Sequence, residues 1–513
     1  MTSPIIIRNL TTRPLTLDAV ETHGLRTSNA GLSVNALTES VGNIASSLTN
    51  IMGRKGGGGE SPSSSRRPSR DVRRGSQDAE THLHAGMGKK EDLNIRIEPF
   101  TIQKTDLPAT QFGPRESLRL IFKGDGPHRW QIDVPTPVSA SQKLLPLTAD
   151  ATHEYTGVYL RETNFLAIVE STNLHKWMKD LDDSTLLSSL SIPGTHNSPA
   201  CFAALPSVRC QSVQPDEQLK NGIRFLDVRV QPNGDDEKSD DLSLVHGAFP
   251  ISFTGAKKFR SLVKEIFSFL HANPSETVIL SLKREGTGDA TDQQLCKVIR
   301  DHYANPRQWY LKPQVPTLGE CRGKIVLLRR FKLTNDLKAA HGGTGWGLNA
   351  QRWDYNSPNC RHGDVQVQDF CEVLETENID QKIQICCDHF VRAAAADCAA
   401  APHADEAHHE AHVEAHASNK NKTPPLYLNF LSAANFWKPG CWPDKIAAKL
   451  NPAVTRYLVE KHQCGPPAAG DGDGDGGLGI VVADWVGEKG DWDLVRCIVS
   501  MNGRLLLKQR RRK

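Results

Sequence analysis

The N-terminal third of the chain shows short segments in which apolar and polar residues alternate. They are residues 4–20, 93–102, 117–122 and 130–134. Such alternation is typical of strands with one buried face. Residues 54–90 between them are rich in Gly, Ser, Pro and Arg and cannot bury a core, so we predict a disordered basic loop there. We therefore expect residues 1–170 to form a β-rich N-terminal domain.

From about residue 185 onward, short apolar runs alternate with segments of helical period such as TDQQLCKVIRDHY and PAVTRYLVEKH. The alternation of strand and helix implies parallel strands, and eight of them fit a closed barrel better than an open sheet. The fold class predicted for residues 175–505 is therefore α/β, a TIM-like (β/α)8 barrel with low-complexity inserts near 394–418 and 468–477. The eight runs are LSSLSIPGTH, GIRFLDVRV, LSLVHG, TVILSLK, KIVLLRRF, VQVQDF, LYLNFLSA and GIVVADWV.

Composition narrows the functional classes. A chain of 513 residues is long enough for two folded units, and its net charge of +3 is too small to indicate a nucleic-acid partner. We see no signal peptide and no apolar run long enough to span a membrane, which predicts an intracellular, cytoplasmic protein with peripheral membrane association. The twelve cysteines are scattered and form no C-x-x-C pair, so we expect reduced thiols.

Polar residues that can carry chemistry stand at the C-terminal ends of the apolar runs. In a barrel these ends share one rim, where the loops build the active site. Any one of these residues alone fits an ion pair or a solvated strand end, but the repeated placement favours a site. Bases, cations and acids together suit attack on a phosphate diester. The residues are His196 and Asn197, Asp227 and Arg229, His246, Lys283, Arg330, Asp369, Asn429 and Asp484.

Five ordered motifs, SIPGTHNSPA, NGIRFLDVRV, LVHG, NPSETVILSLK and RGKIVLLRRF, resemble the X region of phosphatidylinositol-specific phospholipases C. The resemblance is to the metal-independent, bacterial-like branch and spans about residues 181–502. It implies an enzyme, a phosphoric diester hydrolase that cleaves phosphatidylinositol to diacylglycerol and inositol 1,2-cyclic phosphate. It also implies no cofactor and no metal, and a phosphatidylinositol-containing membrane surface as partner.

The resemblance assigns a catalytic set. His196 takes the proton from the inositol 2-hydroxyl, Asp484 orients His196, and His246 protonates the leaving oxygen. Arg229 binds the phosphate, and Asp227, two residues before it, belongs to the same set.

The resemblance also assigns a substrate-binding set, in which Lys283, Arg330 and Asp369 fix the inositol hydroxyls. The calcium-dependent relatives carry acidic metal ligands at the positions of Arg229 and Lys283. Two cations there would repel calcium, which predicts that no metal is needed.

At two positions the chain differs from the family pattern, and these differences leave alternative functions open. Asn197 stands where the bacterial enzymes have Asp, and we expect it to contact the phosphate or His246. Cys371 stands where the family stacks an aromatic ring on inositol, with Phe370 as a possible substitute. The alternatives are a catalytically weak lipid-binding barrel, or a phosphodiesterase acting on another phospholipid or a GPI-type headgroup. The aromatic residues of NFWKPGCWP are expected either to enter the membrane interface or to pack on a helix.

Overall fold

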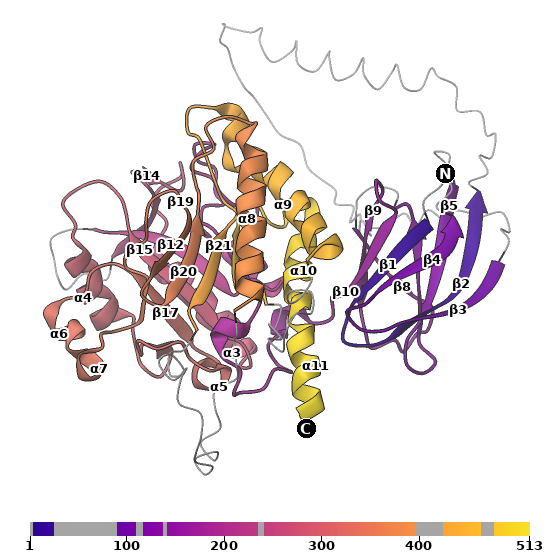
Figure 1. Cartoon of the computed structure of the whole chain (residues 1–513). Coiled ribbons are helices and arrows are strands. Elements are labelled where there is room, and N and C mark those ends of the chain that lie inside the picture. The colour runs from indigo at the N-terminus through magenta and orange to yellow at the C-terminus, as the bar shows by residue number, and fades with distance from the viewer. Residues whose placement is uncertain are drawn as a thin grey trace, which may run out of the picture.

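The computed structural model describes residues 4–24, 90–108, 116–136, 141–233, 241–396, 424–462 and 477–512. The basic loop predicted at 54–90 lies outside this part of the chain except for its last residue. The same holds for residues 397–418 of the first predicted insert and residues 468–476 of the second. The described elements form an N-terminal β-rich region and a curled sheet surrounded by helices (Figure 1).

The β-rich region consists of two five-stranded sheets, of order β4-β1-β10-β9-β7 and β3-β2-β5-β6-β8. Leu17, Phe122 and Trp130 of the second sheet share one buried apolar cluster with Ile7 and Leu166 of the first. β9 and β10 escaped sequence detection because nearly all of their residues are buried, which removes the alternating pattern. The strands are β1 Pro4–Leu10, β2 Leu15–Gly24, β3 Lys90–Ile97, β4 Ile102–Pro108, β5 Glu116–Lys123, β6 Arg129–Val134, β7 Ser141–Lys143, β8 Leu145–Pro146, β9 Tyr155–Leu160 and β10 Phe165–Glu170.

The curled sheet has the order β16-β17-β15-β12-β11-β22-β21-β20-β19, with β13, β14 and β18 attached beside this path. From β16 to β20 each neighbouring pair is parallel. The strands are β11 Ile192–Thr195, β12 Phe225–Pro232, β13 Leu242–His246, β14 Phe249–Pro250, β15 Val278–Arg284, β16 Trp309–Tyr310, β17 Ile325–Arg330, β18 Leu348–Asn349, β19 Ser357–His362, β20 Val365–Asp369, β21 Leu426–Phe430 and β22 Ile480–Ala483.

For one of the eight runs, the prediction of a parallel strand is wrong. The run LSLVHG forms β13, which is antiparallel to β12 and pairs with β14. A short connection from β12 to β13 allows a hairpin, whereas a parallel partner needs a crossover of about a dozen residues. The two ends of the curled sheet meet where the Asp364 N–H donates to the Asn349 carbonyl of β18 at 3.0 Å.

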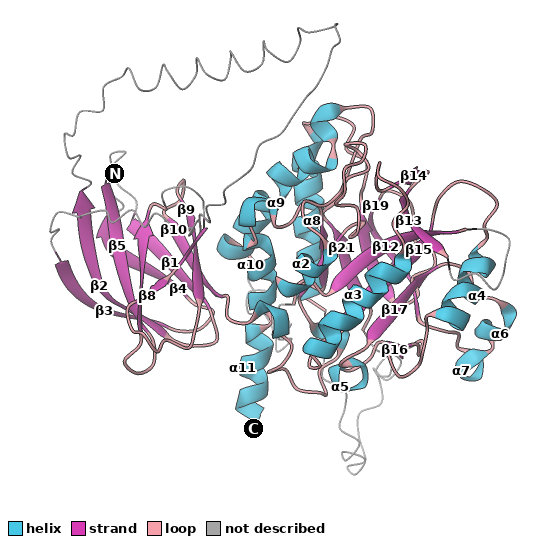
Figure 2. Cartoon of the chain, turned by 180° about the vertical axis from the view of Figure 1, so that it is seen from behind, coloured by secondary structure: helices cyan, strands magenta, loops and turns pink. Residues whose placement is uncertain are grey.

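Helices cover the outer, convex side of the curled sheet (Figure 2). The two segments predicted from helical periodicity are confirmed as α4 and the C-terminal part of α9. In α4, Thr291 forms a capping box with Gln294 that fixes the helix start. No helix in the described residues is long and apolar enough to cross a membrane. The helices are α2 Pro215–Lys220, α3 Phe259–Ala272, α4 Asp292–His302, α5 Leu318–Cys321, α6 Asn335–Lys338, α7 Ala340–Gly343, α8 Asn378–Ala394, α9 Pro443–Glu460, α10 Asp493–Met501 and α11 Gly503–Arg512.

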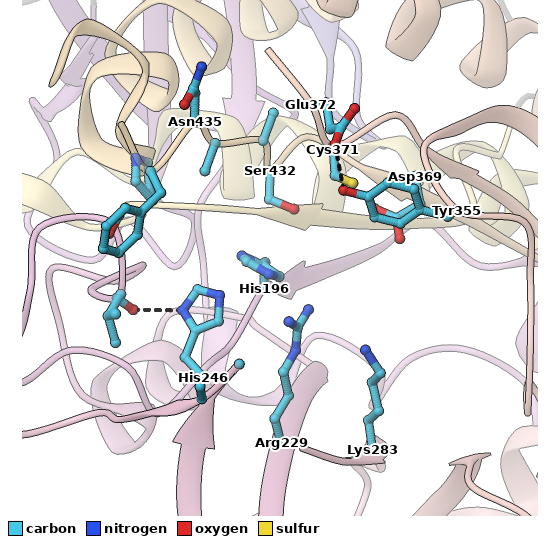
Figure 3. A pocket seen from close by; sticks show the side chains of 18 of the residues that line it. His196, Arg229, His246, Lys283, Tyr355, Asp369, Cys371, Glu372, Ser432 and Asn435 are labelled. Atoms are coloured by element: carbon cyan, nitrogen blue, oxygen red, sulfur yellow. Dashed lines mark hydrogen bonds between the residues drawn. The ribbon is translucent and has the colours of Figure 1, made fainter. Parts of the chain in front are cut away.

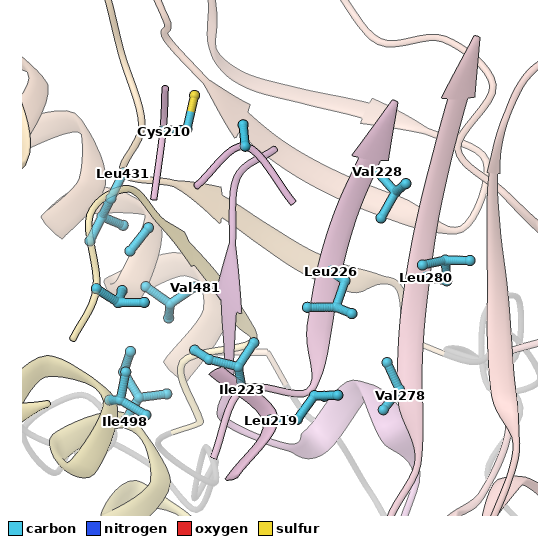
Figure 4. Close-up of a cluster of buried hydrophobic side chains, with 14 of the residues drawn as sticks. Cys210, Leu219, Ile223, Leu226, Val228, Val278, Leu280, Leu431, Val481 and Ile498 are labelled. Carbon is cyan, nitrogen blue, oxygen red and sulfur yellow. The ribbon is translucent and has the colours of Figure 1, made fainter. Parts of the chain in front are cut away.

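Residues along each parallel strand alternate between the two sides of the sheet. Phe225 belongs to the buried cluster on the concave side, and the next residue, Leu226, belongs to the cluster under the helices (Figure 4). Ile279 and Leu280 of β15 repeat this alternation. Because the period is two, Asp227 and Arg229 follow Phe225 on the concave side. On the concave side, the residues therefore change from apolar to charged towards the C-terminal ends of the strands.

The β-rich region is tied to the helical layer by a buried cation. Arg8 of β1 is 4% exposed and donates to the carbonyls of Leu458, Val459 and His462 at the end of α9. The distances are 3.2, 2.7 and 2.7 Å. These carbonyls have no partner within the helix, so the guanidinium satisfies acceptors that would otherwise be buried without hydrogen bonds.

Replacing Arg8 by Ala should lower the free energy of unfolding by about 3 kcal/mol, because three buried carbonyls lose their donor. Chemical denaturation of the purified chain measures this. The control is Arg96→Ala, which removes an exposed guanidinium that pairs with Glu98 and should leave stability nearly unchanged. Equal effects of the two substitutions would contradict the anchoring role of Arg8.

Candidate active site

The site begins with the register of two neighbouring strands. Thr195 of β11 pairs with Ala483 of β22, so His196 and Asp484 leave the two strand ends side by side. The His196 Nδ1 lies 2.9 Å from the Asp484 Oδ1. A carboxylate can only accept, so Nδ1 carries the proton and Nε2 is left as a base. Burial raises the pKa of Asp484, although His196 opposes this shift.

Gly194 permits this close approach of strands. A Cβ at that position would lie 2.9 Å from the Cβ of Phe225 on β12, closer than side chains tolerate. The glycine of the PGTH motif is therefore required by packing between β11 and β12.

Three cations form a row across the next three strands. Arg229 of β12 pairs in register with Lys283 of β15, and Lys283 pairs with Arg330 of β17. Neighbouring parallel strands are about 4.8 Å apart, so the three positive groups would repel one another strongly without counter-charges.

Two carboxylates balance this row. Asp227 is fully buried and accepts from Arg330 at 2.9 Å and from Arg229 at 3.1 Å. Glu285 accepts from Lys283 at 2.7 Å and from Arg229 at 3.2 Å. Burial opposes ionisation of both acids, but the neighbouring cations prevail. The pKa of Asp227 is held well below its usual range by Arg229 and Arg330, and that of Glu285 is lowered to about 2 by Arg229 and Lys283.

A second imidazole faces His196. The rings of His196 and His246 are 5.7 Å apart and nearly perpendicular (Figure 3). His246 Nδ1 lies 2.9 Å from the Val208 carbonyl, an acceptor, so this nitrogen carries a proton. Burial, together with the charges of Arg229 and His196, lowers the pKa of His246 to about 3. His246 is therefore neutral at physiological pH in the ligand-free protein.

His196, His246 and the three cations line a cavity of about 730 Å³ that opens at the end of the curled sheet. Arg330 stacks on the ring of Trp353, with the guanidinium carbon 3.9 Å from the ring centre. The indole N–H of Trp353 donates to Asp369 at 2.9 Å. Asp369 and Tyr355 lie across the cavity from Arg229 and Lys283 (Figure 3). The cavity thus combines two imidazoles, four cations, two carboxylates and an aromatic wall.

Most of the predicted residues come together here. His196, Arg229, His246, Lys283, Arg330 and Asp369 line the cavity directly. Asp227 and Asp484 lie one layer deeper and contact them. Asn197 does not reach the cavity surface: it is fully buried, and its side-chain atoms have no hydrogen-bond partner in the described residues.

Other expectations are wrong. Asn429 lies on the convex side, where it bonds to Gln368 and to the Cys386 carbonyl of α8. Phe370 does not line the cavity, so it does not replace the aromatic ring missing at Cys371. Arg330 lines the cavity as expected, whereas its neighbour Arg329 points away from it and donates to the Phe331 and Trp346 carbonyls.

Sequence reasoning missed several members of the site. Glu285 could have been found, because it stands two residues after Lys283 and therefore on the same side of β15. Trp353 and Tyr355 lie in an irregular segment after β18, and no local pattern marks them. Cys210 also lacks a local signal, although its Sγ is 3.6 Å from His246 Nδ1.

The region that holds the X-region motifs is similar to known proteins. Residues 184–331 match the model of the family described as phosphatidylinositol-specific phospholipase C, X domain. Among characterised proteins, the chain is 30% identical over 208 residues to the 1-phosphatidylinositol phosphodiesterase of Listeria monocytogenes, covering 38% of this chain and 62% of that protein. It is also 30% identical over 194 residues to the enzyme of the same name from Staphylococcus aureus, covering 35% and 59%. The chain thus spans about three fifths of the length of these relatives.

Two solved structures align with part of this chain. The phosphatidylinositol-specific phospholipase C of Listeria monocytogenes aligns with 64% of this chain and 99% of its own, at 22% identity and a TM-score of 0.44. A structure of the Staphylococcus aureus phosphatidylinositol-specific phospholipase C, described as concerning modulation of its membrane binding, also aligns with this chain. The alignment covers 64% of this chain and 98% of the other, at 22% identity and a TM-score of 0.48.

The charge balance predicts a pH-dependent loss of stability. Because its folded pKa is depressed, Asp227 contributes stability that is fully present above the unfolded value of about 3.9 and is lost as pH falls through the folded pKa. Asp227→Asn should therefore cost about 3 kcal/mol at pH 7, and the difference from wild type should shrink below about pH 4. Denaturation at a series of pH values measures this.

The matched variant is Asp484→Asn. The folded pKa of Asp484 is raised, so its contribution is present at low pH and is lost as pH rises through that value. The stability difference should thus change with pH in the opposite direction. Parallel curves for the two variants would contradict the assigned charge states.

Proposed function

We propose that this chain is a phosphatidylinositol phosphodiesterase of the phospholipase C type, which forms diacylglycerol and inositol 1,2-cyclic phosphate. The observation that carries the proposal is the pair of imidazoles, His196 and His246, facing one another beside Arg229 in one cavity. The X domain and the names of the relatives support it.

In the proposed first step, His196 Nε2 accepts the proton of the inositol 2-hydroxyl, whose oxygen attacks phosphorus. Asp484 holds the ring through Nδ1 and stabilises the imidazolium that forms. Arg229 balances the charge that develops on the phosphate oxygens. The bond from phosphorus to the glycerol oxygen breaks, and His246 supplies the proton to that oxygen.

The low pKa of His246 sets a condition on this step, because a general acid must hold a proton beyond the one donated to Val208. An incoming phosphate anion offsets the positive charge of Arg229 and so raises the pKa of the nearby imidazole. We therefore propose that substrate binding itself protonates His246.

Arg229 and Lys283 support a metal-independent mechanism. A guanidinium fixed by two carboxylates supplies positive charge to the phosphate at the place where a cation would otherwise be required. We also propose that Lys283, Arg330 and Asp369 bind the inositol hydroxyls, in a TIM-like barrel that forms a domain of about residues 175–505. Trp353 keeps Arg330 and Asp369 in place.

The rim of the cavity carries exposed apolar side chains that suit a lipid surface. Trp437 is 87% exposed and Leu374 is 62% exposed. Phe436 contacts the Trp437 ring and stacks on Phe249 of β14, with ring centres 5.8 Å apart. Aromatic residues favour the membrane interface. We propose that this rim, formed by Phe249, Leu374, Phe436 and Trp437, enters the bilayer beside the cavity.

A second candidate is a lipid-binding module with weak catalysis. It is favoured by the buried position of Asn197 and by Cys371 in place of a stacking ring. A phosphodiester with a different headgroup, including a GPI type, is a variant of the enzymatic proposal.

The decisive assay measures release of diacylglycerol and inositol 1,2-cyclic phosphate from phosphatidylinositol vesicles, in EDTA and in calcium. Wild type should turn over equally in both, and His196→Ala should lose about 10²- to 10⁴-fold in rate because the general base is gone. His271→Ala, which removes an exposed imidazole of α3, should retain full activity. Vesicle binding without turnover under either condition would leave the lipid-binding module.

Trp437→Ala should weaken binding to phosphatidylinositol vesicles by about tenfold, since a partly inserted indole loses its apolar contact. Cleavage of a short-chain, monomeric phosphatidylinositol should not change. Leu145→Ala, an exposed apolar residue of β8 outside the rim, serves as the control. A vesicle sedimentation assay in which both variants bind as wild type does would contradict the proposed rim.

A further inference from the structure

Three potential metal ligands meet at the inner wall of the cavity. His196, Cys210 and His246 each bring one donor atom, and the three atoms lie within 4.8 Å of one another. The Cys210 Sγ is 3.6 Å from the His246 Nδ1. In a tetrahedral zinc site, Zn–S bonds of about 2.3 Å and Zn–N bonds of about 2.0 Å place sulfur and nitrogen about 3.6 Å apart. The thiol and the imidazole are therefore close enough to share one ion, once His246 gives up its hydrogen bond to the Val208 carbonyl.

The donor types select the ion. One thiolate with two imidazoles suits Zn²⁺ and other thiophilic cations, whereas Ca²⁺ and Mg²⁺ require oxygen ligands. Both imidazoles line the cavity, so the fourth coordination position would face the open space. Three protein ligands with an open fourth position are common for zinc.

The charges around the cluster are of both signs. Arg229 acts against a cation, but it is paired with Asp227 and Glu285. Asp484 bonds to His196 Nδ1, which is the carboxylate–histidine arrangement that supports a metal ligand. The Oδ2 of Asp484 and the amide of Asn197 are buried without hydrogen-bond partners in the described residues. The Asn197 amide lies beside Cys210, where it can donate to a thiolate.

We propose that His196, Cys210 and His246 form an inhibitory binding site for Zn²⁺ or a similar thiophilic cation. On binding, the Cys210 thiol releases its proton to solvent and its sulfur bonds to the ion. His196 donates its Nε2 lone pair, and His246 breaks its bond to the Val208 carbonyl, carries its proton on Nε2 instead and donates the Nδ1 lone pair. The ion thereby occupies the His196 lone pair that accepts the substrate proton. The inhibitory effect rests on the proposed phosphodiesterase function, whereas the binding itself does not.

The binding test uses the full chain titrated with Co²⁺, whose bond to a thiolate gives a charge-transfer absorption band, followed by displacement with Zn²⁺. Wild type should show the band with one bound ion, and Cys210→Ser should lose it and bind Zn²⁺ at least about 100-fold more weakly. If Cys210→Ser does not fold, as judged by circular dichroism, His246→Ala replaces it in the same titration.

The matched control is Cys398→Ala. It removes the thiol of the Ala/His-rich segment at 394–418, where imidazoles could bind metal independently. The band should persist in this variant. The proposed site would be overturned if the band persisted in Cys210→Ser, or if it were lost in Cys398→Ala alone.

Turnover provides a separate readout. In wild type, Zn²⁺ should suppress phosphatidylinositol cleavage and EDTA should restore it. Turnover that Zn²⁺ leaves unchanged would refute the inhibition while the phosphodiesterase function stands. If no turnover occurs under any condition, the function fails, and the cobalt titration still decides whether the site binds metal.

Discussion

The rest of the site depends on how three adjacent cations are held together. Arg229, Lys283 and Arg330 share one register row, where unscreened repulsion between neighbours amounts to about 3 kcal/mol per pair. Asp227 rises from the layer below, and its two oxygens are divided between Arg330 and Arg229. Glu285 closes the row from the other side. With its counter-charges fixed, the row presents positive charge to the cavity without needing to rearrange.

The two imidazoles depend on this row in different ways. His196 is fixed by Asp484 through the register of β11 and β22 and keeps a free ring nitrogen. His246 comes from β13, which belongs to a hairpin outside the parallel path, and is fixed by the Val208 carbonyl. Burial lowers the pKa of His246, and the charge of Arg229 lowers it further. The two rings, similar in chemistry, are thus held by different partners, a carboxylate for His196 and a backbone carbonyl for His246.

Strand parity explains which predictions succeeded. Asp227, Arg229 and Lys283 follow concave-side apolar residues at even spacing, so their position was predictable once the strands were identified. The same rule would have excluded Asn429, because the neighbouring Leu428 and Phe430 occupy the concave side. The error at LSLVHG has another cause. A buried antiparallel strand and a buried parallel strand give the same short apolar run, and only the pairing separates them.

The sequence by itself determined the strand and helix pattern of the second half of the chain, the X-domain motifs and the identity of the charged rim. These features are local, since burial and period are written in neighbouring residues. The tertiary structure alone decided three contacts. Trp353 stacks on Arg330 and donates to Asp369, Cys210 lies against His246, and Arg8 of β1 donates to the carbonyls at the end of α9. Each of these contacts joins segments distant along the chain. No local pattern encodes them, because they arise only when the curled sheet and its helices are packed together.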